Sequence, residues 1–271
     1  MARLLLFLCL ALATAANAGD ALRIVTLSPH LTELVYALGA GGELVGVSAS
    51  SDYPAEAKHI TRVGDANGID VEKILSLSPD LVLAWWGGTR ETDIQQLEAV
   101  GLKVVRIKGE SLDDIPASIL ILGRLLDREK LARQQVDAFR GSMQTLAQEY
   151  EGKSAIPVFI EVSTRPLMAL SNLHAFSAGL EVCGITNIFA DLQTAAANVS
   201  PESVLFRKPV FVLVPDTLGM AGLADSKARY PSGQGSVKSV VEFDAARAFR
   251  QTPRMLEVVR EVCDRLRSGN R

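Results

Sequence analysis

"GIDVEKILSLSPDLVLAW", Gly68–Trp85, and "VSPESVLFRKPVFVLV", Val199–Val214, decide the fold. When Asp70 is aligned with Ser200, the two stretches match without a gap. The matching pairs are Glu72 and Glu202, Ile74 and Val204, Leu75 and Leu205, Pro79 and Pro209, and Val82 and Val212. Each stretch predicts a short helix that begins at an N-cap residue, buries one apolar face and leads into a buried strand. We therefore expect two similar units in one chain.

Apolar, β-rich runs alternate with helical patterns in both halves of the chain, which favours parallel sheets. These runs predict strands at residues 23–28, 44–48, 80–85, 103–107, 157–162 and 209–214. Residues 127–150 contain good helix formers and no Gly/Ser-rich or Pro-rich linker, so they predict one long, rigid helix. The expected fold is α/β, with an N-terminal lobe at 19–126, this connecting helix at 127–150, a C-terminal lobe at 151–271 and mostly parallel central sheets.

The first 18 residues, "MARLLLFLCLALATAANA", have the features of a secretory signal peptide. Arg3 is followed by an apolar run that is too short to span a bilayer comfortably, and Ala16-Asn17-Ala18 has the small-x-small pattern of a cleavage site. We expect cleavage before Gly19 and export of a soluble protein to the periplasm. After cleavage, Cys183 and Cys263 are the remaining cysteines, and an oxidising compartment favours a disulfide between them. The alternative is two buried free thiols.

The net charge and the missing motifs argue against several classes of function. The net charge is −3, and loss of a signal peptide that holds one arginine and no acid makes it −4. This balance disfavours binding to nucleic acid or to an anionic membrane. The three histidines, His30, His59 and His174, are too scattered to predict a closed metal site. Neither a Gly-x-Ser-x-Gly elbow nor a His-Glu-x-x-His motif is present, so we assign no catalytic residue and expect no enzyme.

The two matched glutamates invite two interpretations. An acid in the first turn of a helix interacts favourably with the helix dipole, and this alone explains Glu72 and Glu202. Their equivalent places on two rigid units also predict a spaced pair of acidic points that would dock on basic residues of a partner.

The whole pattern resembles a known family. The motifs are "TLSPHLTELVYALGAG", "LVGVSASSDYP", "VGDANGIDVEKILSLSPDLVLAWWGG", "LEVCGITNIF" and "VSPESVL". Together they resemble the periplasmic cobalamin-binding proteins of ABC importers, in the helical-backbone class that also carries haem, siderophores and metal ions. The resemblance implies a monomer with two Rossmann-like lobes, a ligand cleft between them and no cofactor other than the carried corrinoid. It also implies that Glu72 and Glu202 pair with arginines of the membrane permease dimer.

The resemblance and the strand ends also suggest which residues bind the ligand. Trp85 lies at the carboxyl end of a predicted strand, where open α/β sheets place ligands, and it matches an aromatic residue of the cobalamin binders. Trp86 follows it, and we expect one of the two to face the cleft. Gly87 would allow a close approach of the backbone. Arg250 matches a family arginine at the corrinoid periphery.

Further candidates come from the same motifs. They are Pro29, His30, Ser50, Asp52, Tyr53 and Asn67. A neutral imidazole at His30 could approach the metal of a macrocycle, or it could simply begin the helix. Family members carry aromatics where this chain has Ser50, Ala66 and, in the second lobe, Ala196 or Ala197. Either the pocket is wider and more polar than in those family members, or the ligand differs from theirs. A haem or ferric-siderophore carrier is the alternative within this class, and a periplasmic enzyme is the alternative from another.

Overall fold

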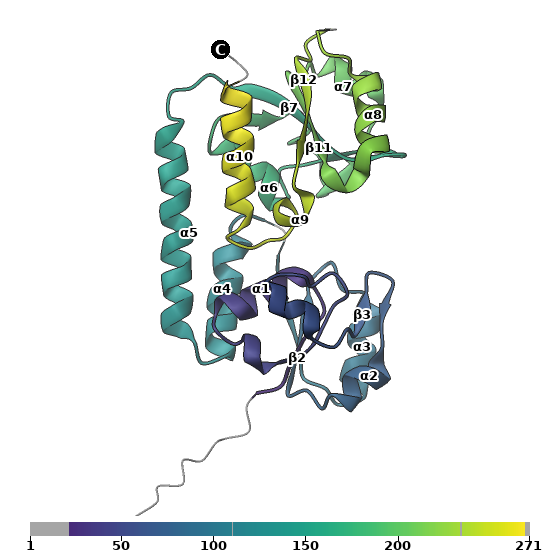
Figure 1. The fold of residues 1–271 in the computed structure, drawn as a ribbon, viewed down its shortest axis with the longest axis vertical. Helices are drawn as coiled ribbons and strands as arrows, with labels where there is room; N and C mark the ends of the chain where they lie inside the picture. The colour runs from purple at the N-terminus through teal and green to yellow at the C-terminus, as the bar shows by residue number, and fades with distance from the viewer. Residues whose placement is uncertain (1–21, 110, 234, 269–271) are drawn as a thin grey trace, which may run out of the picture.

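The computed structural model describes residues 22–109, 111–233 and 235–268, and the expected signal peptide lies outside these ranges. Two α/β lobes lie one above the other, and α5 (Glu129–Glu149) runs along one side of both (Figure 1). The expected two-lobed α/β fold is confirmed. Within the described residues, no helix is both long and apolar enough to cross a membrane.

The N-terminal lobe is built on a four-stranded parallel sheet with the strand order β2-β1-β5-β6. Its strands are β1 (Ile24–Thr26), β2 (Leu44–Val47), β5 (Leu81–Trp85) and β6 (Val104–Ile107). The helices are α1 (Pro29–Ala37), α2 (Val71–Ser76), α3 (Glu91–Ala99) and α4 (Asp114–Leu125). A small hairpin of β3 (Gly64–Asp65) and β4 (Gly68–Ile69) lies before α2. β1 is buried along its whole length and β5 is buried as far as Ala84, as their continuous apolar sequence predicts.

The C-terminal lobe contains a mixed sheet with the order β10-β8-β7-β11-β12, and β9 pairs with the first part of β7. Its strands are β7 (Ile156–Thr164), β8 (Leu167–Leu170), β9 (Ile185–Asn187), β10 (Ala196–Asn198), β11 (Phe211–Pro215) and β12 (Ser239–Phe243). The helices are α6 (Ala175–Glu181), α7 (Pro201–Phe206), α8 (Gly219–Arg229), α9 (Ala245–Ala248) and α10 (Met255–Ser268). The antiparallel pairs β7-β8 and β8-β10 were not expected from the sequence.

The internal repeat extends to details of backbone geometry. Asp70 caps α2 by accepting a hydrogen bond from the Lys73 amide, and Ser200 caps α7 in the same way through the Ser203 amide. Ser78 and Lys208 both adopt positive φ, at 45° and 52°, where each helix turns into its strand. β5 and β11 then begin at equivalent positions. The gap-free match in sequence therefore reflects one structural unit used twice.

α5 joins the lobes through an apolar face. Its buried residues are Ala132, Val136, Phe139 and Leu146, which recur near helical spacing. They belong to one buried cluster that also contains Leu122 of α4 and Val259 of α10, so the core is continuous from one lobe to the other. A helix packed along its length in this way holds the lobes more firmly than a solvated linker would.

A disulfide joins Cys183, just after α6, to Cys263 in α10, as expected. The two cysteines are 80 residues apart in sequence, and both are fully buried beside the same core. The bond ties the last helix of the chain to the centre of the C-terminal lobe.

We predict that Cys183→Ser with Cys263→Ser lowers the free energy of unfolding by about 2–5 kcal/mol, because closing a long loop removes conformations from the unfolded chain. Urea denaturation of the oxidised protein and of the double variant measures this difference. Reductant should destabilise the wild type and leave the variant unchanged. Equal stability of the two proteins without reductant would contradict the prediction.

Candidate functional site: a pocket on the cleft face of the N-terminal lobe

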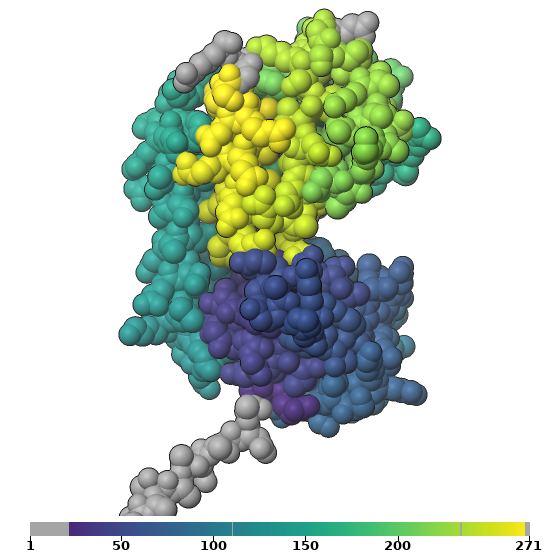
Figure 2. All heavy atoms as spheres, viewed as in Figure 1, coloured from purple at the N-terminus to yellow at the C-terminus, as the bar shows by residue number. Residues whose placement is uncertain are grey.

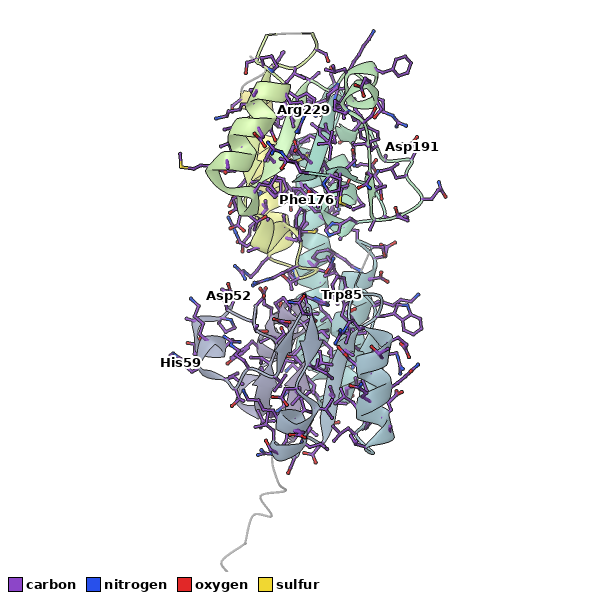
Figure 3. The ribbon with its side chains drawn as sticks, turned by 90° about the vertical axis from the view of Figure 1, so that its right-hand side faces the viewer. Asp52, His59, Trp85, Phe176, Asp191 and Arg229 are labelled. Atoms are coloured by element: carbon purple, nitrogen blue, oxygen red, sulfur yellow. A yellow bond between two sulfur atoms is a disulfide. The ribbon has the colours of Figure 1, made fainter. Side chains whose placement is uncertain are left out.

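A pocket of about 170 Å³ opens where the parallel strands of the N-terminal lobe end. Its lining includes Ser28 and Pro29 after β1, Ser48 and Ser50 after β2, and Trp85 at the end of β5. Parallel strands place their carboxyl ends at one edge of the sheet, and this edge is where open α/β sheets bind ligands. In Figure 2 a notch separates the two lobes on the side away from α5, and in Figure 3 Trp85 and Asp52 lie on the surface that faces the C-terminal lobe.

Trp85 forms a wall of the pocket, and a glycine makes this possible. A Cβ atom added to Gly88 would lie 1.8 Å from Cε3 of Trp85, so the indole ring occupies the space that a side chain would take. Gly87 has φ of 85° and forms the turn after β5. Trp86 is 53% exposed and is not part of the pocket lining. The expectation that one tryptophan faces this site therefore falls on Trp85.

His30 lies beneath Trp85 rather than on the pocket wall. Its side chain is only 3% exposed, and its ring meets the edge of the indole with the centroids 5.2 Å apart. Burial, with a smaller effect of the positive Arg250, lowers the pKa of His30 to about 3, so the imidazole is neutral. Nε2 of His30 and Nε1 of Trp85 are both buried, and neither has a hydrogen-bond partner among the residues that the structure describes. In this conformation His30 supports the tryptophan instead of meeting the cleft.

An ion cluster joins the two lobes at the rim of the pocket. Arg250, from the segment between α9 and α10, donates to Glu33 of α1 at 2.8 Å and to Asp52 at 2.6 Å. Its second terminal nitrogen donates to the Ser50 carbonyl at 2.9 Å. The structure thus brings together Ser50, Asp52 and Arg250, three residues expected to contact ligand, but it pairs them with one another.

Glu33 is the centre of this cluster and is 3% exposed. Besides Arg250, it forms an ion pair with Arg254 at 3.1 Å and accepts a hydrogen bond from the Thr252 hydroxyl at 3.2 Å. A buried carboxylate is tolerated only when it is paired and hydrogen-bonded, and all these partners come from the C-terminal lobe. The folded N-terminal lobe therefore depends on the neighbouring lobe to compensate a charge in its first helix.

Arg254 and Tyr53 extend the cluster along the interface. The guanidinium carbon of Arg254 lies 3.4 Å from the ring centroid of Tyr53, a close cation–π contact. Burial is the largest single effect on Asp52 and alone would raise its pKa, but the hydrogen bond to Arg250, the charges of Arg250 and Lys58 and a backbone hydrogen bond together lower the pKa overall. Asp52 is therefore a stable anion at neutral pH, and Tyr53 packs under a cation.

The matched glutamates lie far from the pocket, at the outer ends of the lobes. Glu72 is in the first turn of α2 and Glu202 in the first turn of α7, and both are exposed. In Figure 1 both helices lie on the side of the molecule away from α5. Hydrogen bonds from its own backbone and from Ser200 lower the pKa of Glu202. The structure thus presents two separate acidic tips on one side of the molecule.

Comparison with known proteins identifies the family. The model of the family described as "Periplasmic binding protein" matches residues 24–239. The chain belongs to the periplasmic binding protein family. It is 35% identical over 269 residues to a vitamin B12-binding protein of Pectobacterium carotovorum subsp. carotovorum, covering 96% of this chain and 95% of that protein. A vitamin B12-binding protein of Yersinia pestis is 34% identical over 246 residues, covering 91% of this chain and 86% of that protein.

Solved structures agree with this assignment. The periplasmic vitamin B12 binding protein BtuF of Vibrio cholerae superposes with a TM-score of 0.79 at 32% identity, covering 92% of this chain and 98% of that one. The periplasmic haem-binding protein RhuT of Roseiflexus sp. RS-1 has a TM-score of 0.77 at 22% identity, covering 90% and 97%. The second likeness shows that the fold is shared and carries nothing about the ligand.

The remaining expected residue of this periplasmic binding protein lies at the pocket margin. Asn67 occupies the two-residue turn between β3 and β4, and its backbone N–H donates to the Asp65 carboxylate. Its neighbour Ala66 lines the pocket, whereas Ala196 and Ala197 lie in β10. Ser50 and Ala66 both line the pocket, so small side chains form this side of it. Among the described residues, no group of three or more His, Cys, Asp or Glu side chains is arranged to hold a metal ion.

Sequence reasoning missed three residues that shape the site of this periplasmic binding protein. Glu33 and Arg254 build the interlobe cluster, and Arg90 lines the pocket while it forms a bidentate pair with Asp93. The importance of Glu33 arises from contacts with residues more than 200 positions away, which no local pattern reveals.

We predict that Gly88→Ala displaces the indole of Trp85, because the new methyl group would overlap it. In a Trp86→Phe background the fluorescence comes from Trp85 alone, and its emission should shift to longer wavelength as the ring becomes more exposed. Gly42→Ala is the matched control, since a Cβ there meets nothing within 4 Å. An emission spectrum that Gly88→Ala leaves unchanged would show that the ring does not need this space.

We predict a loss of stability in mild acid from two buried histidines. Burial lowers the pKa of His174 to about 4, as it lowers that of His30 to about 3. The unfolded chain binds protons on both near pH 6.5, whereas the folded protein does not. The free energy of unfolding should therefore fall from pH 7 toward pH 5, by up to about 1.4 kcal/mol per pH unit for each histidine.

Urea denaturation at several pH values between 7 and 5 measures this slope above the range in which most carboxylates titrate. His30→Gln and His174→Asn should each reduce it, and asparagine can still accept the hydrogen bond that His174 takes from the Phe176 amide at the start of α6. The exposed His59→Gln should keep the wild-type slope. If the free energy of unfolding depended on pH equally steeply in all three variants, the pH effect could not be assigned to His30 and His174.

Proposed function

We propose that this protein is a periplasmic substrate-binding protein that captures a corrinoid, cobalamin or a related compound, and delivers it to the permease dimer of an ABC transporter. The observation that carries the proposal is Trp85, a strand-end aromatic on the cleft face of a chain that is 35% identical to a vitamin B12-binding protein over 96% of its length. The protein acts as a monomeric carrier, without catalysis, a cofactor of its own or a nucleic-acid partner.

The chemistry of the pocket suits part of a corrinoid. Such a ligand is large and amphiphilic, with an apolar ring edge and peripheral amides. The indole of Trp85 offers an apolar face, and the hydroxyls of Ser28, Ser48 and Ser50 offer hydrogen bonds to amides. The Ser28 hydroxyl is buried and has no hydrogen-bond partner within the described part of the chain. A pocket of about 170 Å³ takes only one edge of this ligand, and the rest would lie in the notch between the lobes.

Delivery to the permease rests on the two acidic tips. Glu72 and Glu202 are exposed and lie on separate rigid lobes, so they would meet basic side chains of the two permease subunits at a fixed spacing. Exposed ion pairs add little affinity and act mainly on orientation and on the rate of encounter.

A haem carrier is the alternative within the family, and haem binding would require a side chain of this protein to coordinate the iron. His30 would be the obvious candidate, but its ring is buried beneath Trp85. The corrinoid assignment therefore requires no rearrangement of this histidine, whereas haem ligation through it does.

Calorimetric titration of the mature protein with cyanocobalamin, dicyanocobinamide and hemin in parallel tests the proposal. We expect one-to-one binding of a corrinoid, weakened about tenfold or more by Trp85→Ala, because burial of an aromatic side chain contributes about 1.5–3 kcal/mol. Trp86→Ala is the matched variant and should have a smaller effect, since Trp86 lies outside the pocket lining. Binding of hemin alone would transfer the protein to the haem carriers, and binding of none of the three would overturn the proposal.

A further inference from the structure

The first-turn glutamates of α2 and α7 lie on helix faces that carry similar side chains and differ at one position. In α7, Leu205 and Phe206 follow Glu202 by three and four residues, so all three lie on the same face of the helix. In α2, Leu75 and Ser76 occupy the equivalent places after Glu72. Each tip therefore carries an acid beside a leucine, and the C-terminal tip adds a phenylalanine where the N-terminal tip has a serine.

These apolar side chains do not belong to the core. Phe206 is 85% exposed and Leu205 is 54% exposed, whereas Leu75 is 39% exposed. The helices are anchored instead by their single fully buried residues, Val204 in α7 and Ile74 in α2. A phenylalanine that is 85% exposed buries little surface on folding, and aromatic residues are enriched where proteins bind other proteins.

We propose, building on the docking role proposed above, that Leu205 and Phe206 form an apolar anchor that enters a hydrophobic hollow bordered by basic side chains on one permease subunit. The partner is assigned by continuity and charge, because the apolar pair shares its helix face with Glu202, an anion that a basic border would meet. The N-terminal tip, with Ser76 in place of the phenylalanine, docks mainly through charge. The receptor thus holds the two permease subunits unequally.

Salt dependence follows from this difference. Ion pairs between exposed charges are screened as ionic strength rises, whereas burial of apolar surface is not weakened in this way. At high salt the complex should therefore depend chiefly on the C-terminal tip, and at low salt both tips should contribute.

The experiment measures binding of the ligand-loaded receptor to the corrinoid permease complex of the source organism in lipid nanodiscs, at low and high salt. We expect Phe206→Ser to weaken permease binding about ten- to hundredfold. Because the variant then depends on charge, raising the salt concentration should weaken its binding more than it weakens that of the wild type. Phe206→Leu should retain most of the affinity, and Ser76→Phe should make binding less sensitive to salt. Met220→Ser removes an equally exposed apolar side chain on α8 and should change nothing. Corrinoid affinity should stay the same in all four variants.

The outcomes separate this inference from the docking role on which it rests. If Glu72→Arg with Glu202→Arg leaves permease binding intact, the proposed docking itself fails. If that double variant abolishes binding but Phe206→Ser binds as the wild type does, the tips dock and the apolar anchor is wrong. A wild-type dimer in analytical ultracentrifugation that Phe206→Ser converts to monomer, with permease affinity unchanged, would assign the face to a second copy of this chain and overturn the inference.

Discussion

The buried carboxylate of Glu33 is the constraint on which the arrangement of the two lobes depends. Removing a charge from water is costly unless opposite charge and hydrogen bonds replace the lost hydration. Among the described residues, the side chains that supply both to Glu33 lie across the lobe boundary, in Arg250, Arg254 and Thr252. The same Arg250 also holds Asp52 and the Ser50 carbonyl. One ion cluster thus fixes the lobe interface and the loop that forms one rim of the pocket.

The segment that carries these arginines needs a firm base, and the core of the C-terminal lobe supplies it. Phe249, directly before Arg250, packs edge-on against Phe176 and Phe243, and its ring also meets His174. The disulfide of Cys183 and α10 reinforces the same region. α5 then connects this base to the N-terminal lobe through a continuous apolar core. Apolar packing and the disulfide thus support the interface from the C-terminal side, and α5 continues that packing into the N-terminal lobe.

Sequence reasoning predicted the features that depend on local chemistry. The repeat, its N-caps and its buried strands follow from residues such as Asp70 and Ser200, whose roles need no knowledge of distant contacts. In the C-terminal lobe, β8, β9, β10 and β12 were not among the predicted strands. β10, for example, is a short edge strand of small residues without a β-rich run. In the site, Trp85 was found from its place at a strand end. The pairing of Arg250 was not, because it is decided by Glu33, a residue 217 positions away.

The internal repeat also allows the two lobes to be compared position by position. Because β5 and β11 are equivalent, their last residues can be compared directly: Trp85 ends the first and Pro215 ends the second. The first lobe therefore carries an aromatic wall at the position where the second has a small, rigid ring that cannot make the same contact. At the opposite end of the unit the difference is reversed, since Ser76 stands where the second lobe exposes Phe206. Both lobes share this frame, and a few sequence differences at its exposed ends give one lobe an aromatic pocket wall and the other an apolar outer tip.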